Sequence, residues 1–159
     1  MADQRPPRRT GDDRGTLLAL LQYQRESLVR KVEGVGELEA RWSPVPSGTS
    51  LLWLVTHLAG AEGLWVLQRF AGQAGFVRDD EVREGDSVEG AIQAYREMWA
   101  AVDEVVAGAS LDDSCQADER EHEGPVDLRW ILAHLLEETA RHAGHADLIR
   151  EQLDGSTGR

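Results

Sequence analysis

Apolar residues recur at spacings of three and four in four separate stretches of the chain, which is the period of amphipathic helices. The pattern and its capping residues predict helices that begin at Asp12 or Asp13, at Thr49 or Ser50, at Asp86 or Ser87, and at Asp127. They are expected to end before Gly34, near Phe70, near Val106 and at Gly155. No stretch alternates with the period of a strand, so we expect an all-α protein.

Helices of these lengths predict a four-helix bundle that forms a single domain over residues 12–155. The polar residues 1–11, which include Pro6 and Pro7, predict a disordered N-terminal tail. Long connectors are expected between the first and second helices and between the third and fourth; the latter spans about residues 107–124 and contains Cys115 and His122. Connectors of this length permit a crossover topology as well as simple up-and-down order.

The charge balance and cysteine content exclude several classes of protein. The chain has 17 Lys plus Arg against 29 Asp plus Glu and a formal net charge of −12, which argues against nucleic acid as a partner. No apolar run is long enough to cross a membrane and no signal peptide is recognisable, so we expect a cytoplasmic protein. Cys115 is the only cysteine, so any metal must be held by histidine and carboxylate.

The last predicted helix concentrates histidines and a carboxylate on one face. His134, Glu138, His142 and His145 follow one another at steps of four, four and three, and together span about 80° of the helix circumference. His142 occupies the apolar seam itself, and His57 lies in the middle of the second helix among apolar neighbours. An imidazole removed from water must find hydrogen bonds or a metal, so two helices are expected to bring imidazoles to one interior point.

Neutral imidazoles and carboxylates are ligands for divalent metals such as zinc and nickel. Glu138 and His142 would supply two ligands from adjacent turns, and His57 would complete a set of three from the neighbouring helix. His145 is an alternative to Glu138 as the third ligand. Spacing alone equally allows histidines that are satisfied by ordinary hydrogen bonds, because pairs of His and Glu at this spacing are common on acidic helices.

Three further residues have less specific interpretations. His134 would orient a metal ligand by a hydrogen bond without binding the metal itself, or lie in the core bonded to a backbone carbonyl. Arg141 would bind a carboxylate of a thiol cofactor, or form a surface ion pair. Glu62 lies five residues after His57 and therefore on another face of the helix, where a surface or capping charge is expected.

Two segments carry a resemblance to a known family: SGTSLLWLVTHLAGAEGLW at residues 47–65 and LRWILAHLLEETARHAGHADLIREQLDGSTG at residues 128–158. They resemble the DinB-like superfamily, in particular its actinobacterial branch and the mycothiol-dependent maleylpyruvate isomerases. The resemblance implies a four-helix bundle with a divalent metal held by a histidine of the second helix and an H-x3-H pair of the last. His57 and His142 match two of these ligands.

The sequence departs from the usual motif at two positions. Glu138 stands where the middle histidine is usual, although the maleylpyruvate isomerase relatives use a His, Glu, His set. His145 falls where glutamine is usual, and is expected to contact a ligand or the substrate. The resemblance thus implies His57, Glu138 and His142 as the metal ligands. His134, His145 and Arg141 are expected next to these ligands or at the substrate.

The function that the resemblance implies is that of a divalent-metal-dependent thiol S-transferase or thiol-assisted isomerase, acting on a small electrophile. Members of the superfamily use bacillithiol, mycothiol or glutathione, and a metal favours the nucleophilic thiolate. Lys31 is the only lysine and asparagine is absent, a bias typical of GC-rich actinobacterial genomes, which favours mycothiol. A homodimer is also expected.

Two alternatives stay open at the level of the sequence. A closed four-ligand site that includes His145 would favour a metal-stabilised, non-catalytic bundle acting as a stress-related binding or dimerisation module. A metal-dependent hydrolase would need His145 as the third ligand, which would free Glu138 to act as a base.

Overall fold

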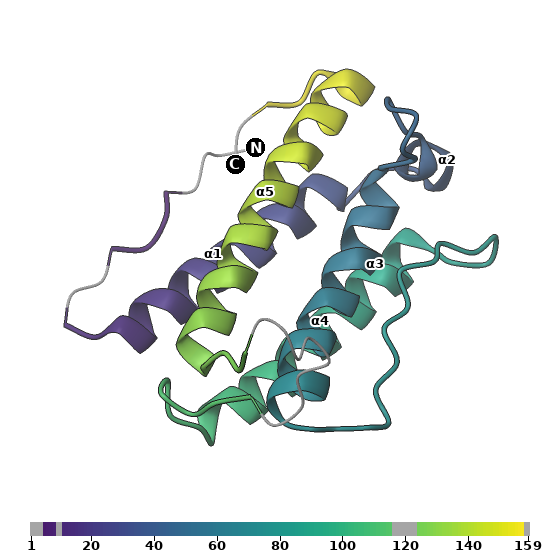
Figure 1. The fold of residues 1–159 in the computed structure, drawn as a ribbon. Helices are drawn as coiled ribbons and strands as arrows, with labels where there is room; N and C mark the ends of the chain where they lie inside the picture. Colours follow the sequence, from purple (N-terminus) through teal and green to yellow (C-terminus); the bar gives the residue numbers. More distant parts are fainter. Residues whose placement is uncertain (1–4, 9–10, 116–123, 158–159) are drawn as a thin grey trace.

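The computed structural model describes residues 5–8, 11–115 and 124–157. Its helices are α1 (Asp13–Val32), α2 (Glu37–Arg41), α3 (Leu51–Glu62), the π-helix η1 (Gly63–Phe70), α4 (Val88–Ala107) and α5 (Leu128–Asp154) (Figure 1). Since η1 continues α3, the described residues contain four long helical stretches at the predicted places and no named strand. The predicted all-α four-helix bundle is confirmed.

The polypeptide differs from the predicted outline in two details. The first connector contains the short helix α2, and the second helix changes from α to π geometry at Gly63 instead of continuing as an α-helix to Phe70. In η1 the chain takes wider turns, as in the bond from the amide of Ala71 to the carbonyl of Val66 (2.9 Å). His122 and most of the predicted N-terminal tail lie outside the described residues.

Each long helix begins with a side chain that accepts a hydrogen bond from a backbone amide of its first turn. These capping residues are Asp12, Ser50, Ser87 and Asp127, all anticipated from the sequence. The helix α5 ends at Gly155, whose φ of 73° is in the left-handed region that favours glycine. Local side-chain and backbone chemistry therefore marks the starts of these four helices and the end of α5.

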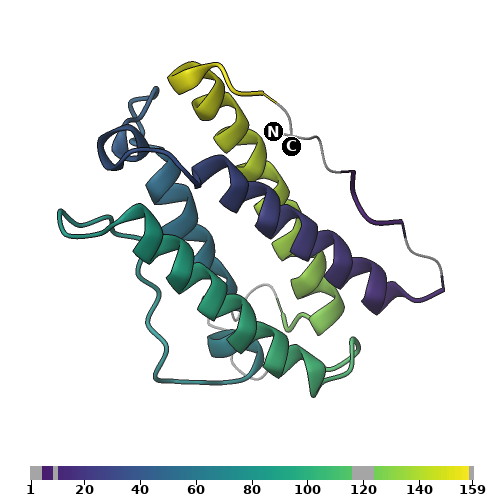
Figure 2. The ribbon, with the colours of Figure 1, turned by 180° about the vertical axis from the view of Figure 1, so that it is seen from behind.

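The helices pack in pairs, with α1 along α5 and α4 along α3 (Figures 1 and 2). In Figure 1, α3 and α5 lie on the side facing the viewer, with α1 and α4 behind them. Buried side chains of all four form two apolar clusters, one around Leu54 and Tyr95 and the other around Leu132 and Val102. Within residues 5–8, 11–115 and 124–157, no helix combines the length and apolar character needed to cross a membrane.

Glu62 was expected on the surface, and this expectation is wrong. Its side chain is completely buried and forms an ion pair with Arg25, whose Nε donates to Oε1 at 3.0 Å. The hydroxyl of Tyr95 donates to the same oxygen at 3.0 Å, and Nη1 of Arg25 also reaches Asp103 at 3.0 Å. Because α3 contacts α1, α4 and α5, a residue on a different face from His57 is still inside the bundle.

The cap of α4 provides a test of these local interactions. Replacement of Ser87 by alanine removes the acceptor of the Gly90 amide (3.0 Å) and is expected to lower the free energy of unfolding by about 1 kcal/mol. Urea denaturation of the metal-free protein measures this change. Ser87→Asp keeps an acceptor and should unfold like the wild type; equal losses in both variants would contradict the capping role.

Candidate metal centre

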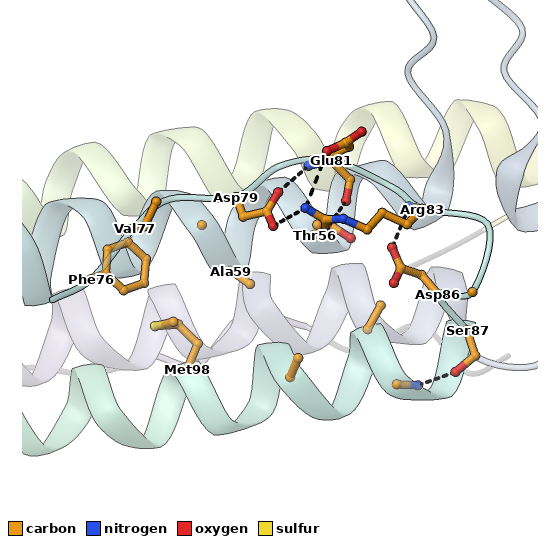
Figure 3. Close-up of a pocket in the computed structure, with 15 residues that line it drawn as sticks. Thr56, Ala59, Phe76, Val77, Asp79, Glu81, Arg83, Asp86, Ser87 and Met98 are labelled. Atoms are coloured by element: carbon orange, nitrogen blue, oxygen red, sulfur yellow. Dashed lines mark hydrogen bonds and ion pairs between the residues drawn. The ribbon is translucent and has the colours of Figure 1, made fainter.

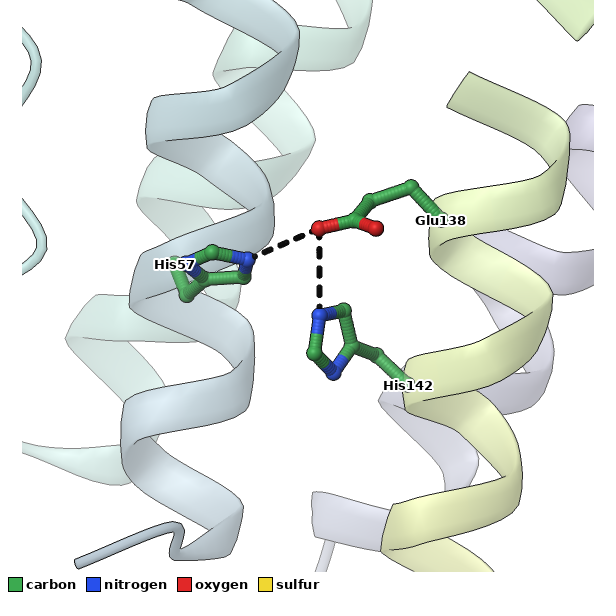
Figure 4. A group of neighbouring side chains, drawn as sticks. All are labelled: His57, Glu138 and His142. Carbon is green, nitrogen blue, oxygen red and sulfur yellow. Dashed lines mark hydrogen bonds and ion pairs between the residues drawn. The ribbon is translucent and has the colours of Figure 1, made fainter. Parts of the chain in front are cut away.

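Three side chains from two helices converge between α3 and α5 (Figure 4). His57 projects from α3, while Glu138 and His142 project from successive turns of α5. Oε1 of Glu138 lies 3.1 Å from Nε2 of His57 and 3.2 Å from Nε2 of His142. In the described part of the chain, this is the one group of three or more His, Cys, Asp or Glu residues whose potential ligand atoms all lie within 4.8 Å of one another.

The three side chains are largely shielded from solvent, and their environment favours the ligating forms. Burial lowers the pKa of His142, although Glu138 opposes this, so the neutral imidazole is favoured at neutral pH. Burial by itself raises the pKa of Glu138, but its contacts with His57 and His142 together lower it below its ordinary value. The site therefore combines neutral imidazole with an ionised carboxylate.

This donor set fits a divalent metal. One carboxylate oxygen and two imidazole nitrogens face a common point, and each is a normal ligand of zinc or nickel. Three protein ligands leave a coordination position for water or a substrate, the arrangement found in catalytic rather than structural zinc sites.

His57 is held from its other side by residues that the sequence did not indicate. Nδ1 of His57 lies 3.0 Å from Oδ2 of Asp80 and 3.0 Å from Nη2 of Arg78. The ring stacks on Trp53, with centroids 4.5 Å apart and an interplanar angle of 21°. Asp80 and Arg78 belong to the loop of residues 71–87, where side chains follow no regular spacing. In the sequence, the one indication of these contacts was the run of acidic residues at 79–81.

Two of the three accessory residues expected from the sequence contact the candidate ligands. Nη1 of Arg141 lies 3.3 Å from Oε2 of Glu138, and Nδ1 of His145 lies 3.2 Å from Nδ1 of His142. His145 is exposed to solvent. Arg141 also pairs with Glu137, so the surface ion pair that was the alternative interpretation is present as well.

The third accessory residue, His134, lies in a different environment. Its ring stacks on Trp130 with centroids 5.0 Å apart and meets the edge of Trp65 at 4.8 Å. The spacing placed His134 on the same face as Glu138, but one turn nearer the start of α5. There it packs beside η1 in an aromatic cluster formed with Trp65 and Trp130.

The sequence was compared with known proteins. The family model of Mycothiol-S-transferase matches residues 16–155. The chain belongs to the mycothiol S-transferase family. This family is DinB-like, so the resemblance inferred from residues 47–65 and 128–158 is confirmed.

A solved structure supports the fold of this mycothiol S-transferase family member. It is described as the conserved protein of locus from Enterococcus faecalis, and it aligns with a TM-score of 0.60 and 17% identity over 92% of this chain and 100% of that chain. At this identity the likeness concerns the fold alone. No curated protein matches the sequence.

Three cavities of this mycothiol S-transferase family member adjoin the residues around the candidate centre. One, of about 420 Å³, lies between the first connector and α5; its lining includes His145 and the apolar side chains Val45, Leu148 and Ile149. The second, of about 440 Å³, lies under the 71–87 loop against α3 and α4 (Figure 3). The third, of about 460 Å³, is lined in part by Trp53 and Asp80, which contact His57. The first borders the candidate centre through His145, which contacts His142.

Proposed function

We propose that the protein is a divalent-metal-dependent S-transferase that joins mycothiol to a small electrophile, with His57, Glu138 and His142 as the metal ligands. The observation that supports this most directly is that one carboxylate oxygen of Glu138 lies within 3.2 Å of a nitrogen of each imidazole, in a chain of the mycothiol S-transferase family. Zinc and nickel are the favoured ions because both accept this mixed donor set.

A divalent ion held by these residues would supply a Lewis acid that favours the thiolate of a bound thiol over the protonated form. In the transfer reaction the thiol gives its proton to solvent, the sulfur forms a bond to the electrophilic atom, and the leaving group departs with its electron pair. Arg141 holds Oε2 of Glu138, so Oε1 is the oxygen directed at both imidazoles. Trp53 restricts rotation of His57 by stacking on its ring.

The two alternative functions, a structural site with His145 as a fourth ligand and a hydrolase with Glu138 as a base, are less well supported. Both require His145 to join the donor set, but its nearest contact with His142 is to Nδ1. The Nε2 atom of His142, on the other edge of the ring, faces Glu138 instead. A three-residue set with His145 at the adjoining cavity favours the transferase over the closed structural site and the hydrolase, and the family match favours transfer over isomerisation.

The remaining parts of the proposal concern the surroundings of the reaction. We place the protein in the cytoplasm, where low-molecular-weight thiols are reduced. The electrophilic substrate is assigned to the cavity beside His145, because its walls at Val45, Leu148 and Ile149 suit an apolar body. A homodimer stays a prediction that size-exclusion chromatography with light scattering would test.

The proposed function predicts a thiol-selective, metal-dependent activity. Zinc- or nickel-loaded protein is expected to accelerate conjugation of mycothiol to monobromobimane, with a higher kcat/KM for mycothiol than for glutathione or bacillithiol. Removal of the ion by a chelator should return the rate to that of the uncatalysed reaction, and reloading should restore it. Rates that do not differ from the uncatalysed reaction with all three thiols would overturn the proposal.

A further inference from the structure

We propose that the loop of residues 71–87 forms part of the metal centre, and that Asp80 in this loop is a positioning residue that orients His57 for metal binding. This inference rests on the proposed function, because it assumes that His57 is a ligand. It assigns a role to a residue outside the ligand set. It also explains why Gly60 and Gly63 occur in the middle of a long helix.

The contacts of Asp80 place its carboxylate where it selects one form of the His57 ring. Oδ2 lies 3.0 Å from Nδ1 of His57, and Nε of Arg78 lies 2.9 Å from each carboxylate oxygen. A hydrogen bond from Nδ1–H to this carboxylate leaves Nε2, the atom directed at Glu138, with its lone pair available for a metal. Arg78 holds the carboxylate in position, and its Nη2 lies 3.0 Å from the same Nδ1. Because a guanidinium only donates, Asp80 is the neighbour of Nδ1 that favours a proton on this nitrogen.

The helix is shaped to receive this loop. Gly60 lies three residues after His57, and Gly63 three residues after Gly60, so each glycine neighbours the preceding member of the series on the helix surface. A Cβ atom on Gly60 would overlap Oδ1 of Asp80 and come within 3.2 Å of Cγ of Arg78, and a Cβ on Gly63 would overlap the ring of Phe76. Neither glycine has a positive φ, so close approach of the loop, not backbone conformation, explains them.

The neighbouring carboxylate faces a different environment. Asp79 accepts from Nη2 of Arg83 at 2.6 Å and lines the cavity under the loop, as Figure 3 shows. Asp80 instead pairs with His57. Of these two adjacent aspartates, Asp80 contacts His57 and Asp79 contacts Arg83 instead. Asp79 is therefore a matched control.

The first test compares these two aspartates. Zinc affinity, measured by competition with a chromophoric chelator, is expected to fall about 10- to 100-fold in Asp80→Ala and to stay at the wild-type value in Asp79→Ala. The visible absorption of the cobalt-loaded protein should change in Asp80→Ala alone. Asp80→Asn keeps an acceptor oxygen beside Nδ1 and should therefore recover part of the affinity.

The second test moves the Asp80 carboxylate without removing it. Gly60→Ala places a methyl group against Oδ1 of Asp80, the end of a side chain that is able to swing away, while alanine favours the helix more than glycine does. We expect weaker zinc binding and an altered cobalt spectrum together with an unchanged or higher melting temperature of the metal-free protein. Gly85→Ala is the control, because its Cβ would meet nothing within 4 Å.

The outcomes separate this inference from the proposed function. Wild-type zinc affinity and cobalt spectra in both Asp80→Ala and Gly60→Ala would overturn the role of Asp80 and leave the ligand set intact. A wild-type protein that binds neither zinc nor cobalt would overturn both proposals. If Asp80→Ala does not fold, as judged by circular dichroism, the comparison of Gly60→Ala with Gly85→Ala decides the matter.

Discussion

Replacement of His142 by alanine is expected to abolish stoichiometric binding of zinc or nickel. The wild-type protein should retain about one ion per chain after dialysis, since three donors from α3 and α5 converge on one point. Without the imidazole of His142, only His57 and Glu138 remain, and two protein ligands do not hold the ion against dialysis. Metal content measured by plasma mass spectrometry on untagged protein gives the result directly, and His57→Ala is expected to behave in the same way.

His134→Ala provides the matched control for this prediction. The substitution is the same and the residue lies on the same helix, but its ring packs against Trp65 and Trp130. We expect this variant to retain the full metal content. Stoichiometric metal in His142→Ala would refute the ligand assignment, whereas loss of metal in His134→Ala as well would show that the assay reports general damage to α5.

The candidate ligands were predictable because each of them lies within a regular helix. A step of four residues places Glu138 and His142 on adjacent turns of one face, and an imidazole in an apolar seam requires a partner. The same arithmetic grouped His134 with them, because it counts angle around the helix and neglects the rise along it. His134 lies eight residues before His142, a rise of about 12 Å along α5, which puts it in another cluster.

The residues that support His57 could not be predicted in this way. Asp80 and Arg78 reach it from a loop, and loop conformation depends on contacts such as that of Phe76 with Gly63 rather than on sequence period. Glu62 was misassigned for a different reason. Its angular position relative to His57 was correct, but the expectation that the other face is solvated fails for a helix that is covered on several sides.

The buried pair of Arg25 and Glu62 is expected to have the largest effect on stability when it is broken on one side. Glu62→Leu leaves the guanidinium of Arg25, which is 1% exposed, without its bidentate partner, and the exposed Asp103 at 3.0 Å is then its one remaining ion-pair partner among the described residues. Breaking a buried ion pair on one side costs about 3 to 5 kcal/mol of unfolding free energy, and the exposed partner Asp103 should hold the loss toward the lower end of this range. Urea denaturation of the metal-free protein measures it. The control is Arg129→Met, which removes the exposed ion pairs with Asp13 and Asp112 and should cost at most about 1 kcal/mol.

The double variant Arg25→Met/Glu62→Leu distinguishes the value of the pair from the penalty of breaking it. With both charges gone, the desolvation cost disappears with the attraction, so most of the lost stability should return. The hydroxyl of Tyr95 then loses its acceptor, which limits the recovery. A double variant no more stable than Glu62→Leu would mean that Arg25 and Glu62 are not coupled. Because Glu62 is the last residue of α3 before η1, recovered stability with unchanged zinc affinity would also show that the charges are not needed to hold His57 in place.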